Sequence, residues 1–232
     1  MGVLVKMAAI RLKITVLLFI SAILLGIGFY FIYPVVSTLK KENPKKTSFM
    51  EYREEEWERE GKKIKIRQIW IPYSSISPYL VKAVLIAEDD KFWSHEGFDF
   101  DAGGSTISQQ LAKNLYLTPS KNPLRKVKEA ILTWRIERTL SKKRILELYL
   151  NVAEWGEGIF GIEAASRHYY GKPASDLTPE EAARLASVLP NPRRYKPVGD
   201  SKYVGNRSRI IYNIMVKRGI VITESGDIES KE

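Results

Sequence analysis

A run of 23 residues without a charged side chain, Ile14 to Val36, most limits how this 232-residue chain folds. A helix of that length, rising about 1.5 Å per residue, is about as long as a bilayer's hydrocarbon core is thick. A cleaved signal peptide has a shorter apolar run that ends in small residues. This run ends instead in residues that suit a membrane interface, Tyr30, Phe31, Tyr33 and Pro34. We therefore predict a retained transmembrane helix over 14–36, preceded by residues 1–13.

Basic residues flank both ends of this run, so the flanking charge does not fix its orientation. Lys6, Arg11 and Lys13 precede the run, and four lysines follow it: Lys40, Lys41, Lys45 and Lys46. Long domains are translocated largely regardless of such charges.

The composition excludes several kinds of site. The chain has no cysteine, so it forms neither a disulfide nor a thiolate metal site. Its two histidines, His95 and His168, argue against a multi-histidine metal centre. Hydrophobic residues make up 44% of the chain, which is enough for a packed core.

Most of the formal charge of +10 is concentrated in one segment. Residues 102–145 hold ten lysines and arginines, opposed by Glu129 and Glu137 alone. A basic excess of this kind indicates either a local anionic partner or a solvated basic helix face, and charge alone leaves both open. No aromatic-rich nucleic-acid motif lies beside it, so we expect no nucleic-acid partner.

After the apolar run the chain is predicted to be mainly α-helical. Residues 37–63 are highly charged and are predicted to form a stalk that is helical or flexible. Weak alternation over 64–71 allows a short strand. Signals that begin or end helices follow at Ser77-Pro78, Asn122-Pro123, Ser141, the Thr178–Glu181 capping box, Pro190 and Gly219, with a last helix over about 202–218.

Glu88 ends an otherwise apolar helix face, because Val81, Val84, Leu85 and Glu88 follow the i, i+3, i+4, i+7 spacing. Partial burial raises the pKa of a carboxyl group and makes it a stronger base. The alternative is that Glu88 points to water at the end of its helix. Spacing alone leaves both interpretations open.

A glycine-rich turn leads into a helix with one polar face. Gly103 and Gly104 allow close backbone approach to a ligand, and the following helix start offers free N–H groups to an anion. The polar face carries Thr106, Gln109, Gln110 and Lys113, which could hold a diphosphate and a sugar. The alternative is a plain capping box between Thr106 and Gln109.

A second candidate carboxylate follows two basic residues. Glu129 lies three residues after Lys126 and four after Arg125. The spacing fits an ordinary helical ion pair, and it equally fits a site carboxylate held among phosphate-binding cations.

Five segments in chain order resemble the five motifs of the peptidoglycan glycosyltransferases, which occur alone or as the first domain of bifunctional penicillin-binding proteins. Glu88–Gly97 is similar to E-D-x-x-F-x-x-H-x-G, and Gly103–Gln110 to G-G-S-T-I-S/T-Q-Q, followed by Lys113-Asn114. The other three are Arg125–Glu129 (R-K-x-x-E), Ile145–Asn151 (I-L-E-x-Y-L-N) and Arg184–Pro190 (R-x-x-x-V-L-P). The resemblance covers about residues 69–196.

This resemblance implies a mainly α, lysozyme-like domain over 64–232 with a small membrane-apposed lobe. By residue match, Glu88 would be the catalytic base and Glu129 the second site glutamate. The residues implied to line the donor and diphosphate region are Gln109, Gln110, Lys113, Asn114, Arg125 and Lys126, with Ser105 and Thr106 at its edge. The chain ends at Glu232, which leaves no room for a transpeptidase and implies the stand-alone form.

The implied reaction joins lipid-linked disaccharides (lipid II) into β-1,4 glycan strands and releases polyprenyl diphosphate. The implied partners are lipid II, the growing lipid-linked strand, the bilayer and other cell-wall synthesis proteins. The expected location is the cytoplasmic (inner) membrane, with a cytoplasmic N-terminus and the catalytic domain outside. No cofactor is required, although Mg²⁺ or Mn²⁺ could assist the diphosphate. The alternatives are a lysozyme-like hydrolase and a non-catalytic scaffold.

One segment departs from the family pattern. Gly97-Phe98-Asp99-Phe100-Asp101-Ala102 runs directly into Gly103, where family members have a longer, mobile, lipid-facing segment. Either the segment is deleted or the printed sequence omits it, and we favour omission. A true deletion would put lipid binding and activity in doubt, and an intact mass distinguishes the two.

Overall fold

The computed structural model describes residues 2–101, 103–119, 122 and 124–222. Within them the chain is mainly α-helical, as predicted, with a few short strands and 3-10 turns. The helices are α1 (Gly2–Phe29), α2 (Ser48–Arg59), α3 (Pro78–Glu88), α4 (Ile107–Tyr116), α5 (Leu124–Thr139), α6 (Lys142–Val152), α7 (Ile162–Tyr170), α8 (Pro179–Val188) and α9 (Lys202–Lys217). The 3-10 turns are η1 (Val36–Lys40), η2 (Tyr73–Ser75) and η3 (Ala174–Asp176).

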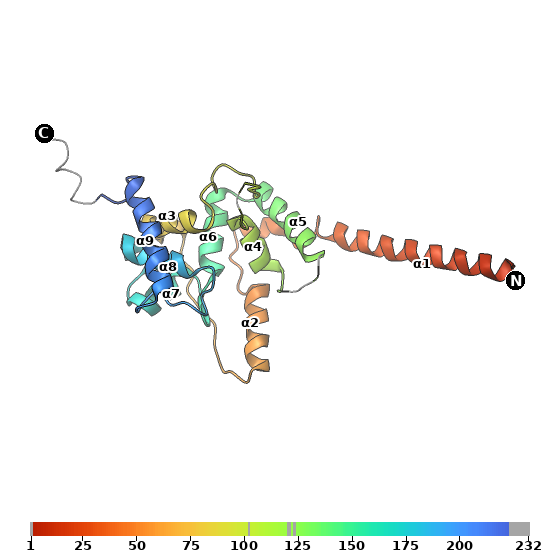
Figure 1. Cartoon of the computed structure of the whole chain (residues 1–232), viewed down its shortest axis with the longest axis horizontal. Helices are drawn as coiled ribbons and strands as arrows, with labels where there is room; N and C mark the ends of the chain where they lie inside the picture. The colour runs from red at the N-terminus through yellow and green to blue at the C-terminus, as the bar shows by residue number, and fades with distance from the viewer. Residues whose placement is uncertain (1, 102, 120–121, 123, 223–232) are drawn as a thin grey trace.

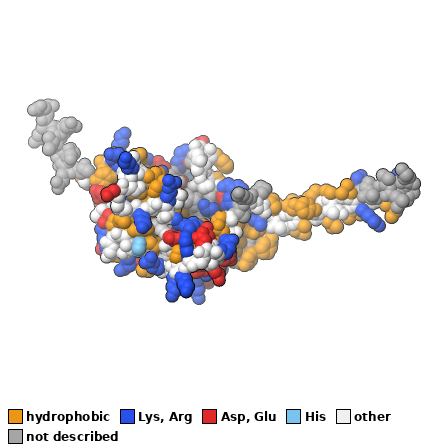
Figure 2. All heavy atoms as spheres, turned by 60° about the horizontal axis from the view of Figure 1, so that its bottom comes forward, with side chains coloured by type: hydrophobic (Ala, Val, Ile, Leu, Met, Phe, Trp, Pro, Cys, Tyr) orange, Lys and Arg blue, Asp and Glu red, His pale blue; other side chains and the backbone are white. Residues whose placement is uncertain are grey.

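The helix α1 projects away from the rest of the molecule and exposes a mostly hydrophobic surface (Figures 1 and 2). Its stretch Ile10–Phe29 has a mean hydropathy of 2.4 and is long and apolar enough to cross a membrane. The helix begins before Ile14 and ends at Phe29, seven residues before the predicted end at Val36. Pro34 explains the early end, because proline lacks the N–H that a helix needs and restricts the residue before it.

Residues 37–63, predicted to form a stalk, instead pack on the domain. Leu39 of η1 is buried, and α2 buries Met50 and Trp57, which lie seven residues apart on one face. Helix α2 contacts α4, and Thr47 caps its first turn by accepting from the N–H of Met50. The helical alternative was therefore correct, but this helix packs against α4 and does not form a separate stalk.

Two groups of helices form the hydrophobic core. Helix α3 packs against α8 and α9, whereas α4 packs against α5 and α6. Leu80 and Val84 of α3, Leu111 of α4, Leu148 of α6 and Leu185 of α8 are fully buried. This arrangement brings the C-terminal end of α3, which carries Glu88, close to α4 and α9 (Figure 1).

A small three-stranded sheet lies beside the helices, in the order β1-β3-β2. Strand β1 (Arg67–Gln68) is parallel to β3 (Ile159–Phe160), and β2 (Glu154–Gly156) is antiparallel to β3. The short strand that the alternation over 64–71 allowed is therefore present, as the two residues of β1. Gly161 leaves β3 with a φ of 79°, and a Cβ atom there would lie 2.7 Å from the carbonyl oxygen of Asn151.

The helix signals read from the sequence occur in the structure. Pro78 begins α3, Ser141 caps α6, and Thr178 forms the capping box of α8 with Glu181. Helix α9 ends at Lys217, and Gly219 then adopts a φ of 65°. Pro123 lies outside the described residues, and α5 begins directly after it.

Candidate active site

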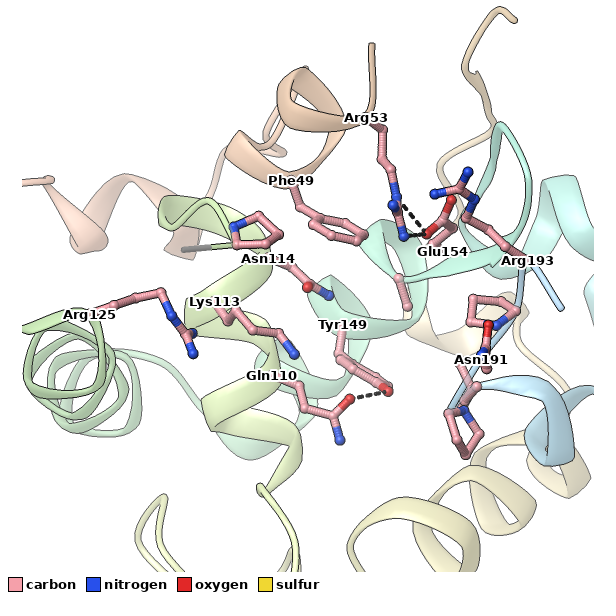
Figure 3. A pocket seen from close by; sticks show the side chains of 15 residues that line it. Phe49, Arg53, Gln110, Lys113, Asn114, Arg125, Tyr149, Glu154, Asn191 and Arg193 are labelled. Atoms are coloured by element: carbon pink, nitrogen blue, oxygen red, sulfur yellow. Dashed lines mark hydrogen bonds and ion pairs between the residues drawn. The ribbon is translucent and has the colours of Figure 1, made fainter. Parts of the chain in front are cut away.

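A cavity of about 610 Å³, called the main cavity below, opens between α2, α4, α6 and the segment after α8 (Figure 3). One end of it carries Lys113 and Arg125, and the other carries Arg53, Glu154 and Arg193 (Figure 3). The remaining lining residues are Phe49, Gln110, Asn114, Pro119, Tyr149, Ala153, Leu189, Pro190, Asn191 and Pro192. Candidate residues Gln110, Lys113, Asn114 and Arg125 therefore lie together.

Glu129 holds basic side chains at the end of the main cavity that carries Lys113 and Arg125. Its side chain is only 4% exposed and forms ion pairs with Arg125, at 3.2 Å, and with Lys126. The charge of Glu129 also acts on Lys113. Burial lowers the pKa of the Lys113 ammonium group, and the negative charge of Glu129 opposes that change. A buried acid that holds two bases three and four residues earlier fixes the positive charge in place.

Glu88 is connected to the main cavity through Gln110. The Nε2 group of Gln110 donates to Oε2 of Glu88 at 3.0 Å, and the Tyr149 hydroxyl donates to Oε1 of Gln110 at 3.1 Å. Glu88 itself lines a second hollow of about 300 Å³ with Ser105 and Thr106. Gln110 thus joins the carboxylate to the wall that carries Lys113.

Burial gives Glu88 the character of a base. Its side chain is 11% exposed. Burial raises the pKa of its carboxyl group, while the Gln110 hydrogen bond and the charges of Arg207 and Lys113 lower it. Oε1 of Glu88 is buried and has no hydrogen-bond partner among the described residues. A desolvated carboxylate with one unused oxygen can accept a proton from a bound hydroxyl group.

Asp89, the next residue, has a structural contact. Its carboxylate accepts from the backbone N–H of Ile107 at 2.9 Å, and His95 Nε2 lies 2.9 Å from the other oxygen. This places an anion at the N-terminus of α4, where the helix dipole favours it. Asp89 therefore orients α4, and with it Gln110, relative to Glu88.

Thr106 and Gln109 form the helix cap that the sequence offered as an alternative. Thr106 Oγ1 accepts from the N–H of Gln109 at 3.2 Å, and Oε1 of Gln109 accepts from the N–H of Thr106 at 2.9 Å. The Thr106 hydroxyl also donates to the carbonyl of Gly97. Both side chains are engaged in the cap and neither lines the main cavity. Ser105 lies at the second hollow, and its carbonyl accepts from Gln110.

The second end of the main cavity was not foreseen from the sequence. Arg53 of α2 donates to Oε2 of Glu154 at 2.8 and 3.0 Å, and Arg193 pairs with Glu56 at 2.7 Å. Burial raises the pKa of the Glu154 carboxyl group, and Arg53 opposes the change. No local pattern signals this cluster, because Arg53 and Glu154 are 101 residues apart. Tyr149, in contrast, belongs to a recognised motif and could have been proposed.

The acids near Glu88 are engaged in other contacts. Among the described residues no group of three acids or histidines is arranged to hold an ion. Asp89 is bound to His95 and α4, Asp90 pairs with Arg218, and Asp101 pairs with Lys91. The described cations that line the main cavity are Arg53, Lys113, Arg125 and Arg193.

The fold and this site define an α-helical protein that carries an N-terminal apolar helix and has a cavity lined by basic residues near a largely buried carboxylate. Residues 58–216 match the family model described as "Transglycosylase". The chain belongs to this family, and it is a glycosyltransferase.

Curated relatives agree with this assignment. Two proteins called "Biosynthetic peptidoglycan transglycosylase", from Nitrosospira multiformis and Azoarcus sp., are 47% and 48% identical over 194 and 195 residues. Each match covers 77% of this chain and 84% of the relative. A protein of the same name from Neisseria gonorrhoeae is 42% identical, covering 84% of this chain and 91% of the relative. Penicillin-binding protein 1A from Haemophilus influenzae, a solved structure, aligns with a TM-score of 0.44 and 22% identity, over 73% of this chain and 18% of that one.

The match to the Nitrosospira protein also shows a difference in length. The match to the Nitrosospira protein extends over 194 residues but takes up 77% of this chain, which is about 179 of its 232 residues. About fifteen aligned positions therefore have no residue here.

Proposed function

We propose that this chain polymerises lipid II into the β-1,4 glycan strands of peptidoglycan and releases polyprenyl diphosphate. The name shared by its relatives supports the substrate, and the main cavity supports the chemistry. The observation that carries the proposal is the contact between Gln110 and Glu88, which joins a buried base to a cavity wall bearing Lys113 and Arg125.

In the proposed reaction, Oε1 of Glu88 removes the proton from the 4-hydroxyl group of the acceptor sugar. The hydroxyl oxygen attacks the anomeric carbon of the donor, and the bond from that carbon to the diphosphate oxygen breaks. The electron pair leaves with the diphosphate, and attack opposite the leaving group converts an α-linkage into a β-linkage. Lys113 and Arg125 stabilise the charge that develops on the diphosphate.

Glu129 has a different role in this proposal, because it holds Arg125 and Lys126 in place. Diphosphate is a good leaving group, so no general acid is needed. Glycoside hydrolysis differs, since there two carboxylates share the work and one protonates the leaving oxygen. The excess of cations over carboxylates at this end of the cavity therefore favours transfer from a diphosphate over hydrolysis.

The helix α1 is proposed to anchor the enzyme in the cytoplasmic (inner) membrane as a single span. Residues 1–13 would be cytoplasmic, and the catalytic domain would face the periplasm or exterior. Because both substrates are lipid-linked, the tether raises their effective concentration at the site. Other cell-wall synthesis proteins are proposed partners. No cofactor is required, and Mg²⁺ or Mn²⁺ would act on the diphosphate itself.

Incubation of the detergent-solubilised chain with lipid II and with finished glycan strands tests this function. Polymer formed from lipid II, and absent with Glu88→Gln, supports the proposal. Shortening of finished strands would instead identify a hydrolase. If Glu88→Gln changes neither reaction but complements cells that lack the gene, the chain is a scaffold.

A further inference from the structure

Arg207 reaches Glu88 from the last helix, outside all five motifs. Helix α9 packs against α3 and α8, and Arg207 faces the C-terminal end of α3. Its terminal NH2 group donates to the carbonyl of Ala87 at 3.1 Å and lies 3.7 Å from Oε1 of Glu88. The side chain is 33% exposed, and its Nε is buried without a hydrogen-bond partner among the described residues.

The two oxygens of Glu88 are therefore approached from two different elements. Gln110 of α4 donates to Oε2, whereas Arg207 of α9 lies beside Oε1 at a distance too long for a direct hydrogen bond. The carbonyl of Ala87 fixes the guanidinium group, so its position does not depend on a bond to the carboxylate. Oε1 is consequently free of hydrogen bonds to the described residues, while the positive charge of Arg207 faces it.

We propose that Arg207 is a positioning residue for the reaction: it keeps the Glu88 carboxylate ionised and oriented so that Oε1 receives the acceptor proton. This inference rests on the proposed function, because it assumes that Glu88 is the base. Arg207 touches neither reacting sugar in this scheme and acts through Glu88 alone.

The electrostatic balance at Glu88 supports this role. Burial raises the pKa of the carboxyl group, and Asp89 on the same segment also raises it. Gln110 and Lys113 from α4 and Arg207 from α9 lower it. Of these two positive charges, that of Arg207 has the larger effect on Glu88, and Lys113 lies in a buried setting that lowers its own pKa. Without Arg207, less positive charge would oppose the effect of burial, and the pKa of the Glu88 carboxyl group would rise further.

The test compares the pH dependence of kcat/KM for the full-length chain and three variants in detergent with lipid II. Arg207→Gln removes the charge, Arg207→Lys retains it, and Arg209→Gln removes a charge from the same helix. Arg209 is exposed and bonds to Asn206, so it is a matched control. The acidic limb of the profile is the fall in kcat/KM at low pH. For Arg207→Gln we expect this fall to occur about one pH unit higher than in the parent chain. We expect Arg207→Lys to retain most of the parent profile and Arg209→Gln to match it.

Infrared spectroscopy gives a readout that does not depend on activity. The C=O band of protonated Glu88 is identified by its loss in Glu88→Gln. The pH at which this band falls to half its intensity (its midpoint) should rise in Arg207→Gln by the same amount as the acidic limb. If Arg207→Gln lowers kcat equally at every pH and leaves the midpoint unchanged, the role is only structural and the inference is wrong. If Arg207→Gln does not fold, the Arg207→Lys variant carries the test. Because lysine retains the positive charge, a clear shift of the acidic limb in Arg207→Lys overturns the inference. If the parent chain makes no polymer, the proposed function is wrong. If the parent makes polymer and the acidic limb of Arg207→Gln is not shifted, only this inference is wrong.

Discussion

Glu129 is buried and Glu88 is largely buried, but the surroundings of the two glutamates differ. Glu129 forms direct ion pairs with Arg125 and Lys126. Glu88 has one neutral hydrogen-bond donor, Gln110, and its nearest cation lies 3.7 Å away. A carboxylate in direct ion pairs is held as an anion, whereas one that is desolvated and incompletely paired binds a proton more readily. The comparison teaches that burial alone does not identify a base; the partners of each oxygen do.

The sharpest test of this comparison removes the base. Glu88→Gln keeps the shape of the side chain and its neighbour Gln110 but cannot accept the proton. We expect the rate of polymer formation to fall by about 10²–10⁴-fold, the usual contribution of a general base. Binding of lipid II, measured separately by fluorescence with labelled substrate, should change little. Polymer formation at the parent rate would show that Glu88 is not the base.

Glu129→Gln tests the other half of the comparison. The variant leaves Arg125 and Lys126 without their anionic partner, so the cations are less well placed for the diphosphate. We expect roughly a tenfold to hundredfold loss of kcat/KM, because a charge-assisted contact is worth about 1.5–3 kcal/mol. The acidic limb of the pH profile should stay where it is in the parent chain. A moved limb would mean that Glu129, too, titrates as a base.

Gln110→Met sharpens the difference between the two glutamates. The variant removes the hydrogen bond to Oε2 of Glu88 and breaks the connection to Tyr149. Since this hydrogen bond lowers the pKa of Glu88, its loss raises that pKa further. The fraction of ionised base then falls as the pH is lowered, and activity should be lost at a higher pH than in the parent. Rates near pH 9 should recover to within about tenfold, because the base is ionised there in both chains.

Thr106→Ala is expected to have the smallest effect on the chemistry. The structure uses the Thr106 hydroxyl to cap α4 and to bind the carbonyl of Gly97. Loss of an N-cap costs about 1 kcal/mol of unfolding free energy, which thermal unfolding in detergent would detect as a lower Tm. Activity well below that Tm should stay within about twofold of the parent. A large rise in KM without a change in Tm would instead make Thr106 a substrate ligand.

Much of the fold and of the site could be predicted from the chain. Caps at Ser141 and Thr178 act within one helical turn, so local sequence suffices to find them. The apolar spacing that ends at Glu88 allowed either a partly buried or a solvent-facing carboxylate, and the structure shows a side chain that is 11% exposed. The motif around Lys113 and Asn114 correctly grouped residues of one cavity. Each of these features depends on residues a few positions apart.

Other features depend on residues that meet only in the folded chain. The charged segment 37–63 resembled a stalk, yet Met50 and Trp57 bury one face of α2 against the domain. Most residues of α2 are charged or polar, so the two apolar residues on one face were too few to predict that the helix packs against the domain. The capping box at Thr106 and Gln109 fitted two interpretations, and the structure selected the cap.

The sequence by itself determined the apolar N-terminal helix, the caps of several later helices and Glu88 as the candidate base, because these follow from hydropathy, capping and the order of motifs. Only the tertiary structure decided which groups face that base. Gln110 lies 22 residues from Glu88, and Arg207 lies 119 residues away. Proton affinity depends on charge and burial within a few ångströms, and the packing of α3 against α4 and α9 sets those distances.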